Sequence, residues 1–248
     1  MRKSIIGLSA PILFGALAVI SAPAMAQDAP TDAVTLSGNV GLVSDYRFRG
    51  FTQNGEDAAV QGGITAAHES GFYGSVWASS INFAGNTEVD LSAGYSKEIA
   101  SGITIDAGLL YYLYPKHGDY NTDFFEPYVN LTGTVGPASI KLGVNYAWKQ
   151  SALLDGNGEK ASSFYAHVEP TIGIPNTPFS LVGHAGFAKS DAFPGGPDGD
   201  VFDYSIGGSA SYKMLSFGIS YVNTDVGNGM KESLGADGAV VFSLTAAF

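Results

Sequence analysis

Hydrophobic and polar residues alternate with a period of two along most of the chain after residue 33. In the first such segment, apolar side chains occupy even positions from Val34 to Phe48, with Thr, Ser, Asn, Asp and Arg between them. The same alternation is clear at 88–95, 140–148, 202–213 and 240–248. Successive side chains of a β-strand point to opposite faces, so the pattern predicts strands with one apolar and one polar face.

Weaker alternation fills the intervals, at 58–69, 72–82, 103–114, 123–135, 162–173, 179–188 and 215–224. Together these segments predict about twelve strands of roughly 10 to 13 residues, long enough to cross a bilayer when tilted. Strand would occupy roughly 60% of the mature chain, well above its share in an ordinary soluble domain. Inside hydrocarbon every backbone polar group must be paired. The predicted fold class is therefore all-β, a transmembrane antiparallel up-and-down β-barrel.

The links between the predicted strands alternate between longer polar segments and shorter turns. The longer links are 50–57, 115–122, 151–161, 189–201 and 225–235, and the shorter ones are 70–71, 98–102, 136–138, 174–178 and a turn around Met214. A link near Gly85 falls in the long class but is short. Long extracellular loops and short periplasmic turns are typical of outer-membrane barrels, so an even strand count with both termini in the periplasm is expected.

Aromatic residues gather near the ends of the predicted strands. Toward the outside these are Tyr46, Phe48, Tyr111, Tyr112, Tyr114, Phe124, Phe125, Tyr146 and Trp148, and toward the periplasm Phe72, Tyr73, Tyr95, Phe179, Tyr212 and Phe217. Aromatic girdles at both interfaces are typical of membrane barrels. The sequence stops on Phe248, and this terminal aromatic residue resembles the assembly signal of outer-membrane barrels, which implies recognition by the barrel assembly machinery.

The first 26 residues predict a cleaved secretory signal. Arg2 and Lys3 precede an apolar run from Ile5 to Ile20, and Ala24-Met25-Ala26 matches an A-x-A cleavage site. We predict cleavage between Ala26 and Gln27, leaving a single barrel domain over residues 27–248. The expected location is the outer membrane of a Gram-negative bacterium.

Composition and charge exclude several function classes. The chain has 12 Lys plus Arg against 23 Asp plus Glu, a net charge of −11, which becomes −13 when Arg2 and Lys3 leave with the signal. Such a chain offers no basic surface for nucleic acid, and without Cys it contains no disulfide scaffold. Charged residues make up 14% of the chain, against roughly 25% in a typical soluble domain. Part of the surface therefore faces a solvent other than water.

Three segments near the start of the mature chain carry a family resemblance. Residues 43–53 read Val-Ser-Asp-Tyr-Arg-Phe-Arg-Gly-Phe-Thr-Gln, residues 59–64 read Ala-Val-Gln-Gly-Gly-Ile, and residues 68–79 read His-Glu-Ser-Gly-Phe-Tyr-Gly-Ser-Val-Trp-Ala-Ser. Together they resemble the TorF family of porins from Gram-negative proteobacteria, in motifs that cover about the first 50 mature residues. The resemblance implies an outer-membrane barrel with channel activity, and it brings no substrate or site residues with it.

If the apolar side chains of each strand face lipid, the polar side chains at the alternate positions face the lumen. The predicted pore-lining residues are Asp45, Arg47, Arg49, Glu88, Asp90, Asp106, Glu126, Lys141, Lys149, Glu169, Asp203 and Lys213, with His167 beside Glu169. In an open pore such charges select the solutes that enter. In a filled interior, opposite charges would instead pair and close the barrel, and Asp45 with Arg47 and Arg49 is the expected cluster.

The predicted outer loops are acidic. Their carboxylates are Glu56, Asp57, Asp119, Asp123, Asp155, Asp191, Asp198, Asp200, Asp225 and Asp237. An acidic mouth concentrates cations and repels anions, with an effect that fades as salt rises. The sequence therefore predicts a weak preference for cations. Acidic loops also keep a surface solvated, or bridge to lipopolysaccharide through divalent ions.

Other function classes have weaker support. Period-two alternation also fits a secreted β-sandwich whose apolar face points inward. A lipid-modifying enzyme would use His167 and Glu169 with Ser163 or Ser205, but the chain lacks G-x-S-x-G and H-E-x-x-H. The remaining histidines, His68, His117 and His184, lack metal-ligand spacing, so neither metal nor cofactor is predicted. We predict a passive channel for small hydrophilic solutes, with a closed structural or surface-interaction barrel as the main alternative.

Overall fold

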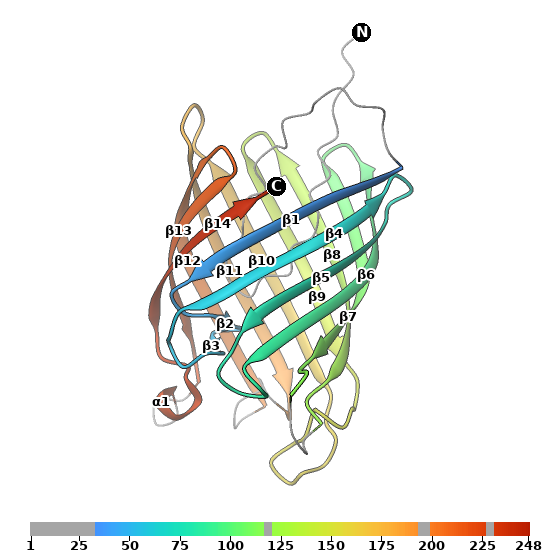
Figure 1. Ribbon diagram of the computed structural model, residues 1–248, viewed down its shortest axis with the longest axis vertical. Coiled ribbons are helices and arrows are strands. Elements are labelled where there is room, and N and C mark those ends of the chain that lie inside the picture. The colour runs from blue at the N-terminus through green and yellow to red at the C-terminus, as the bar shows by residue number, and fades with distance from the viewer. Residues whose placement is uncertain (1–32, 117–120, 193–198, 227–230) are drawn as a thin grey trace.

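A closed antiparallel barrel makes up most of this protein, as described by a computed structural model of residues 33–116, 121–192, 199–226 and 231–248 (Figure 1). Its strands are β1 (Val34–Val43), β4 (Ala59–His68), β5 (Phe72–Ser80), β6 (Thr87–Ala100), β7 (Ile103–Leu113), β8 (Phe124–Val135), β9 (Ala138–Ala147), β10 (Ser163–Gly173), β11 (Phe179–Ser190), β12 (Asp200–Tyr212), β13 (Leu215–Thr224) and β14 (Ala239–Ala247). The predicted signal, residues 1–26, lies outside the described residues.

Two short strands and one short helix lie outside the barrel wall. Strands β2 (Arg47–Phe48) and β3 (Phe51–Thr52) pair only with each other, and α1 (Lys231–Leu234) belongs to the link before β14. Within the ranges that the structure describes, no helix has the length and apolarity needed to span a membrane.

The barrel closes because β1 pairs with both ends of the strand series. Each other wall strand pairs antiparallel with its neighbours in the chain, while Val43 of β1 lies opposite Ala59 of β4 and Ser243 of β14. Closure leaves no strand edge with free N–H and C=O groups, as a bilayer interior requires. The predicted fold class, an antiparallel barrel of about twelve strands, is confirmed.

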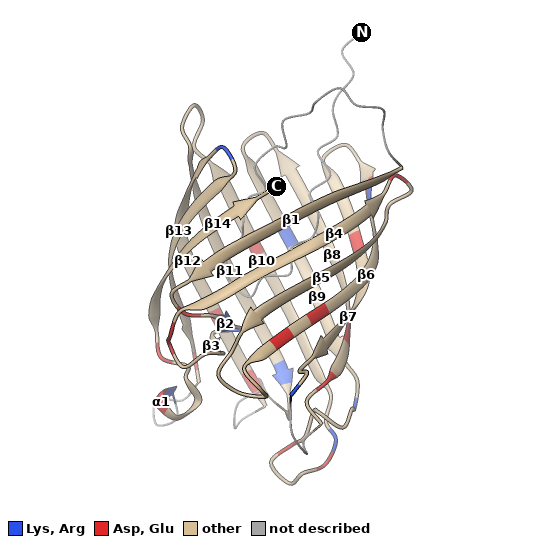
Figure 2. Cartoon of the chain, in the orientation of Figure 1, with Lys and Arg blue, Asp and Glu red and all other residues tan. Residues whose placement is uncertain are grey.

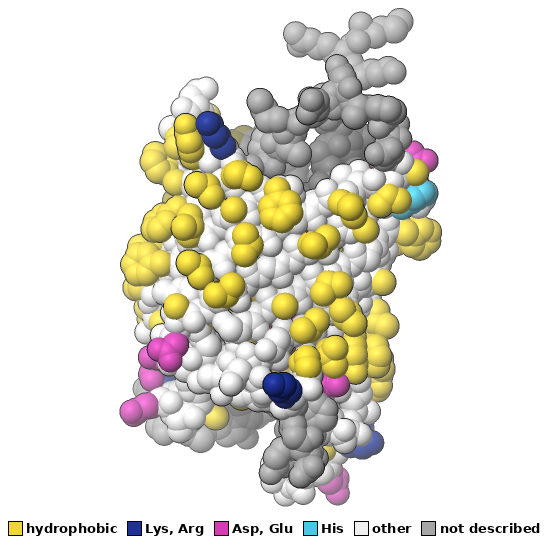
Figure 3. Space-filling model, viewed as in Figure 1, with side chains coloured by type: hydrophobic (Ala, Val, Ile, Leu, Met, Phe, Trp, Pro, Cys, Tyr) yellow, Lys and Arg dark blue, Asp and Glu magenta, His cyan; other side chains and the backbone are white. Residues whose placement is uncertain are grey.

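The apolar parity of each strand points outward. Leu36, Ile64 and Ile206 expose 60 to 70% of their surface on three different strands, and hydrophobic side chains spread over the visible barrel wall (Figure 3). In water this exposure would be unfavourable, whereas in lipid it is the expected arrangement. The period-two pattern thus marks an outward apolar face, not the inward one of a β-sandwich.

The long links gather at one end of the barrel and the short turns at the other (Figure 1). The long links span 44–58, 114–123, 148–162, 191–199 and 225–238, with the predicted short exception at 81–86. The opposite end has the turns 69–71, 101–102, 136–137, 174–178 and 213–214, and it also holds the start of β1 and the chain end at Phe248. By the usual asymmetry of such barrels, the end with long links is the outer one.

The predicted first strand is wrong beyond Val43. The alternation continues to Phe48, but Arg49 and Gly50 have φ angles of +51° and +87°. Two successive residues with positive φ form the two-residue turn of a tight hairpin. The chain therefore reverses between β2 and β3 instead of extending the barrel wall.

The predicted aromatic girdles are partly correct. On the outer side Tyr111 stacks on Phe125 at 4.4 Å between ring centroids, and at the other end Phe72 meets Tyr95 at 5.1 Å. Tyr46, Tyr112 and Tyr114, also expected in the outer girdle, and Tyr73, expected in the inner one, are instead buried inside the barrel. Parity explains Tyr112, which occupies the polar parity of β7, and the hairpin reversal explains Tyr46.

Inward side chains are packed most tightly in the outer half of the lumen, and some of those at the inner end are exposed. Inward-facing Leu110 and Val241, near the outer loops, expose 1% of their surface. By contrast, Thr35 and Ser37 share the inward parity at the inner end of β1 and are exposed. The packed core of this protein therefore lies inside the barrel, next to the outer loops.

Candidate functional site

The β2–β3 hairpin crosses the lumen and contacts opposite walls. On one side, Arg49 Nη2 donates to both carboxylate oxygens of Glu126 on β8 at 2.8 Å. Its guanidinium carbon also lies 4.1 Å from the ring centroid of Tyr165 on β10. On the other side, Gly50 approaches so closely that an added Cβ would meet the Thr224 side chain at 2.9 Å. The hairpin thus occupies part of the outer lumen and narrows it.

Polar contacts hold the hairpin in its inward position. Arg47 pairs with Asp45 at 2.5 Å and donates from Nη1 to the backbone carbonyls of Gly235 and Asp237 at 3.1 and 2.9 Å. The Thr52 hydroxyl donates to the other Asp45 oxygen at 2.6 Å. The expected cluster is therefore correct for Asp45 with Arg47, whereas Arg49 pairs across the lumen with Glu126.

The strand positions of the barrel wall are acidic on the inside. Inward carboxylates come from Glu88, Asp90, Asp106, Glu126, Glu169 and Asp203, and the inward ammonium is that of Lys141. Acidic positions occur both within strands and around the lower loops (Figure 2).

Two predicted pore-lining residues do not face the lumen. Lys149 lies two residues beyond the end of β9, and Lys213 lies in the turn between β12 and β13; both are exposed. Their prediction is wrong because the alternation was followed past the ends of these strands. Without them, the inner wall has a clear excess of negative charge.

Three wall carboxylates form no ion pair within the described residues. Glu88 and Asp90 lie on β6 and Asp106 on the adjacent β7, and we call this set the acidic stripe. The hydroxyl of Tyr46 donates to Glu88 and that of Tyr73 to Asp106, both at 2.8 Å, while one buried Asp90 oxygen accepts no hydrogen bond. The other three carboxylates lie next to Arg49, Lys141 or His184. Negative charge is therefore least compensated on the β6–β7 side.

Tyrosines that the alternation did not assign to the lumen fill part of it. Tyr73 and Tyr165 lie flat over glycines of neighbouring strands: an added Cβ on Gly94 would meet Tyr73 at 2.6 Å, and one on Gly186 would meet Tyr165 at 2.0 Å. Glycine at an inward position, next to an inward tyrosine on the adjacent strand, is the signal that would have identified them.

A cavity of about 250 Å³ remains between the hairpin and the outer loops. Aromatic and aliphatic side chains line it, including Phe48, Tyr112 and Leu153, and two carboxylates, Glu88 and Glu126, also reach it. Arg49 also lines the cavity and pairs with Glu126, so Glu88 is the lining carboxylate that has no ion pair within the described residues. The size of the cavity suits a small solute, and Glu88 favours a cationic one.

The acidic outer mouth is described except for Asp119 and Asp198, which lie outside the described residues. The exposed carboxylates there are Glu56, Asp57, Asp191, Asp200, Asp225 and Asp237, while Asp123 and Asp155 are half-buried. These side chains are available to concentrate cations near the barrel entrance.

Asp155 organises the outer loop 148–162, which supplies Leu153 to the cavity. Its Oδ1 accepts the backbone N–H groups of Glu159 and Asn157, both at 2.8 Å, and these hydrogen bonds lower its pKa. The lowered pKa means that the ionised form stabilises the fold above the ordinary value of about 3.9, and that this stabilisation is lost as pH falls through the lowered value.

We expect the backbone amide resonances of Asn157 and Glu159 to shift together on acidification, with a midpoint below about 3.9. NMR of the protein in micelles measures this directly, and Asp155→Asn should abolish the transition. A shared midpoint above the ordinary Asp value would contradict the assignment.

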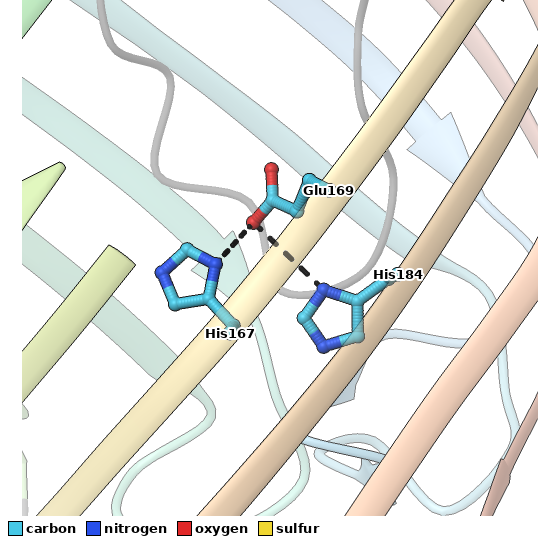
Figure 4. A group of neighbouring side chains, drawn as sticks. All are labelled: His167, Glu169 and His184. Carbon is cyan, nitrogen blue, oxygen red and sulfur yellow. Dashed lines mark ion pairs between the residues drawn. The ribbon is translucent and has the colours of Figure 1, made fainter. Parts of the chain in front are cut away.

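Three titratable side chains meet on the inner face of β10 and β11. His167 and Glu169 of β10 lie beside His184 of β11 (Figure 4). Within the described residues Ser163 Oγ makes no hydrogen bond, and none joins His167 to Ser205, while His184 bonds to Tyr165 and Asp203 at 2.8 and 2.9 Å. A serine nucleophile would need a hydrogen bond to its base, so this arrangement does not support the enzyme alternative.

A family model describes the same barrel region. Residues 27–248 match the family Gcw_chp, whose description is "Bacterial protein of unknown function". No curated protein matches the chain in sequence.

Solved porins share the fold. The NanC porin structure is 14% identical, with a TM-score of 0.58, and the alignment covers 86% of this chain and 99% of that one. The KdgM porin in complex with disordered oligogalacturonate is 9% identical, with a TM-score of 0.54, covering 86% and 97% of the two chains. At such identities the likeness shows the fold alone, a porin-type barrel.

Proposed function

The chain belongs to the bacterial family of unknown function Gcw_chp, and from its own geometry we propose a porin-like channel. It would let small hydrophilic solutes and ions diffuse passively across the outer membrane, with a preference for cations. The observation that carries this proposal is the acidic stripe, Glu88, Asp90 and Asp106, whose carboxylates form no ion pair with any Lys, Arg or His of the described residues. Charged rings of this kind select ions at close quarters.

The shape of the lumen supports a narrow channel rather than a wide one. Thr35 and Ser37 at the inner end are exposed, while the β2–β3 hairpin, Tyr46 and Tyr112 narrow the outer half. A barrel of this strand number lies between small filled barrels and large water-filled porins. Solutes would therefore pass beside the hairpin, where the cavity of about 250 Å³ lies.

The porins of similar fold suggest a contrast in solute charge. The KdgM structure is a complex with oligogalacturonate, a polyanion. The wall of this chain presents six carboxylates and one lysine, which would repel such a ligand. We therefore propose neutral and cationic solutes.

Other parts of the proposal concern location and assembly. The family match begins at residue 27, in agreement with the predicted cleavage after Ala26, and the motifs at residues 43–79 resemble the TorF porins. We also propose that Phe248, whose backbone pairs with buried Gly38 of β1, acts as an assembly signal. Lipopolysaccharide, bridged by divalent ions, is the proposed partner of the acidic loops.

Single-channel recording tests the channel proposal. Refolded protein in a planar bilayer under a potassium chloride gradient should give discrete steps, with a reversal potential of cation-selective sign. Steps with equal permeability for potassium and chloride at low salt would contradict the cation preference. A barrel that is shown to be folded and inserted but gives no steps would favour the closed structural barrel.

Neutralising the acidic stripe should remove most of the preference of the channel for cations. We expect Glu88→Gln, Asp90→Asn and Asp106→Asn together to move the reversal potential toward zero, because these carboxylates belong to the inner wall and none of them forms an ion pair within the described residues. As a matched control, three exposed loop carboxylates, Asp191, Asp225 and Asp237, are changed to Asn. Their effect should disappear at about 1 M salt, where the screening length is only about 3 Å. If the two triple variants changed the reversal potential equally at high salt, the acidic stripe would not be the source of the cation preference.

A further inference from the structure

His167, Glu169 and His184 converge on one carboxylate oxygen. His167 and Glu169 are two residues apart on β10 and so share its inward face, while antiparallel pairing of Val168 with Ala185 brings His184 beside them. The Nδ1 atoms of His167 and His184 lie 3.0 and 3.8 Å from Glu169 Oε1 (Figure 4). One ligand atom from each of the three residues lies within 4.8 Å of the others.

Both imidazoles are largely buried, and each Nδ1 lies next to Glu169 Oε1 as an ion-pair neighbour without a hydrogen bond of its own. The His167 and His184 side chains are 8% and 9% exposed, and neither Nδ1 makes a hydrogen bond of acceptable geometry. A buried polar atom without a hydrogen bond is unfavourable, so each such atom calls for an explanation. A ligand positioned between the two rings and the carboxylate would satisfy all three atoms at once.

The surroundings of His184 match those of a metal-binding histidine. Its other ring nitrogen, Nε2, lies 2.9 Å from Asp203 Oδ1, and Asp203 is 1% exposed. Metal-bound histidines commonly donate their second N–H to a carboxylate, which fixes the ring orientation and strengthens the donor atom. Asp203 therefore acts as a positioning residue for His184 Nδ1.

We propose that His167, Glu169 and His184 bind one divalent transition-metal ion of the Zn²⁺ type on the lumen wall. Two imidazole nitrogens and one carboxylate oxygen are a ligand set that Zn²⁺ accepts, with a fourth position left for water. Around a tetrahedral ion with bonds of about 2.1 Å, ligand atoms are about 3.4 Å apart. The measured separations from Glu169 Oε1 bracket that value, so small side-chain movements complete the site.

Lys141 on β9 tunes this site without occupying it. Its Nζ lies 2.5 Å from the other carboxylate oxygen, Glu169 Oε2, which leaves Oε1 for the ion. The ammonium group weakens metal binding through charge repulsion, and we expect Lys141→Met to tighten it by roughly tenfold at the effective dielectric of a partly buried site. A variant that gains affinity cannot be explained by misfolding.

Cobalt titration of the refolded, tag-free protein in detergent micelles tests the site. Co²⁺ should bind one ion per chain, show the visible absorption of a tetrahedral complex, and be displaced by Zn²⁺. Glu169→Gln and His184→Ala should each abolish this absorption, and Asp203→Asn should weaken binding by about 10- to 100-fold. His68→Ala is the matched control, because His68 is an exposed histidine on β4 away from the site.

Several results would overturn the metal site. One is that folded protein binds neither Co²⁺ nor Zn²⁺ at millimolar concentration. Another is that bound Co²⁺ shows the absorption of an octahedral complex, and a third is that wild type and Glu169→Gln bind the ion equally. Because the assay measures bound ions and not conductance, its failure leaves the channel proposal standing. Conversely, a barrel that does not conduct can still bind the ion.

Discussion

Replacing the β2–β3 hairpin with a tight turn is expected to raise the single-channel conductance several-fold. The backbone N–H of Gln53 donates to the Tyr46 carbonyl at 2.7 Å, so Asn-Gly in place of residues 47–52 would close the same hydrogen bond as a two-residue turn. The change removes Arg49 and Gly50 from the lumen, where they contact opposite walls. Conductance should rise because it is limited by the narrowest cross-section.

Two controls make this result specific. The shortened protein also carries Asp45→Asn and Glu126→Gln, because loss of Arg47 and Arg49 would leave these two carboxylates unpaired, and the full-length double variant shows the effect of those changes alone. Strand content by circular dichroism should be unchanged, since β2 and β3 form no part of the wall. Unaltered conductance in a folded, shortened barrel would locate the constriction elsewhere, for example at the contact between Tyr73 and Tyr128.

Arg49→Ala should lower the free energy of unfolding by about 3 to 5 kcal/mol, the usual cost of removing one partner from a buried ion pair. Arg49 and Glu126 are 6% and 1% exposed in their side chains, and Tyr112 and Asn145 also donate to this carboxylate. The variant loses the charge-assisted bonds and the contact with Tyr165. Urea unfolding of the barrel in lipid vesicles measures the change.

A double-mutant cycle separates the interaction between Arg49 and Glu126 from the other contacts of Arg49. Arg49→Ala with Glu126→Gln should recover a large part of the loss, since no uncompensated charge remains. Arg49→Gly should cost less than Arg49→Ala, because the backbone at this position has a φ of +51°, which glycine adopts without strain. Lys149→Ala, on the exposed loop, should change stability by less than about 0.5 kcal/mol. A loss below about 1 kcal/mol for Arg49→Ala would contradict a buried pair in the folded barrel.

Most of the barrel could be predicted from alternation because lipid imposes a strict pattern on each strand. Segments such as 103–114 and 215–224 agree with β7 and β13 to within one residue. The prediction for the first strand fails beyond Val43, where the alternation continues but the apolar side chains no longer face lipid. Tyr46 and Phe48 keep the apolar parity of β1, yet they pack against the interior of the barrel.

The candidate site was predictable only in part. Parity correctly gave inward positions for Glu88 and Asp106, but it could not show that their carboxylates have no paired cation. The alternation also gave no sign that His184 lies beside His167, because the two residues are on different strands, β11 and β10. Ion pairing and ligand geometry depend on strand register, which a single strand does not encode.

The sequence by itself determined the strands, the outward apolar face and the asymmetry of the loops, since each follows from local alternation and the demands of a bilayer. Only the tertiary structure decided what fills the lumen. Arg49 reaches Glu126 across 77 positions of sequence, and the hairpin that carries it turns inward because its partners lie on distant strands. Closing the barrel creates these contacts, and no local pattern could specify them before the strands were in register.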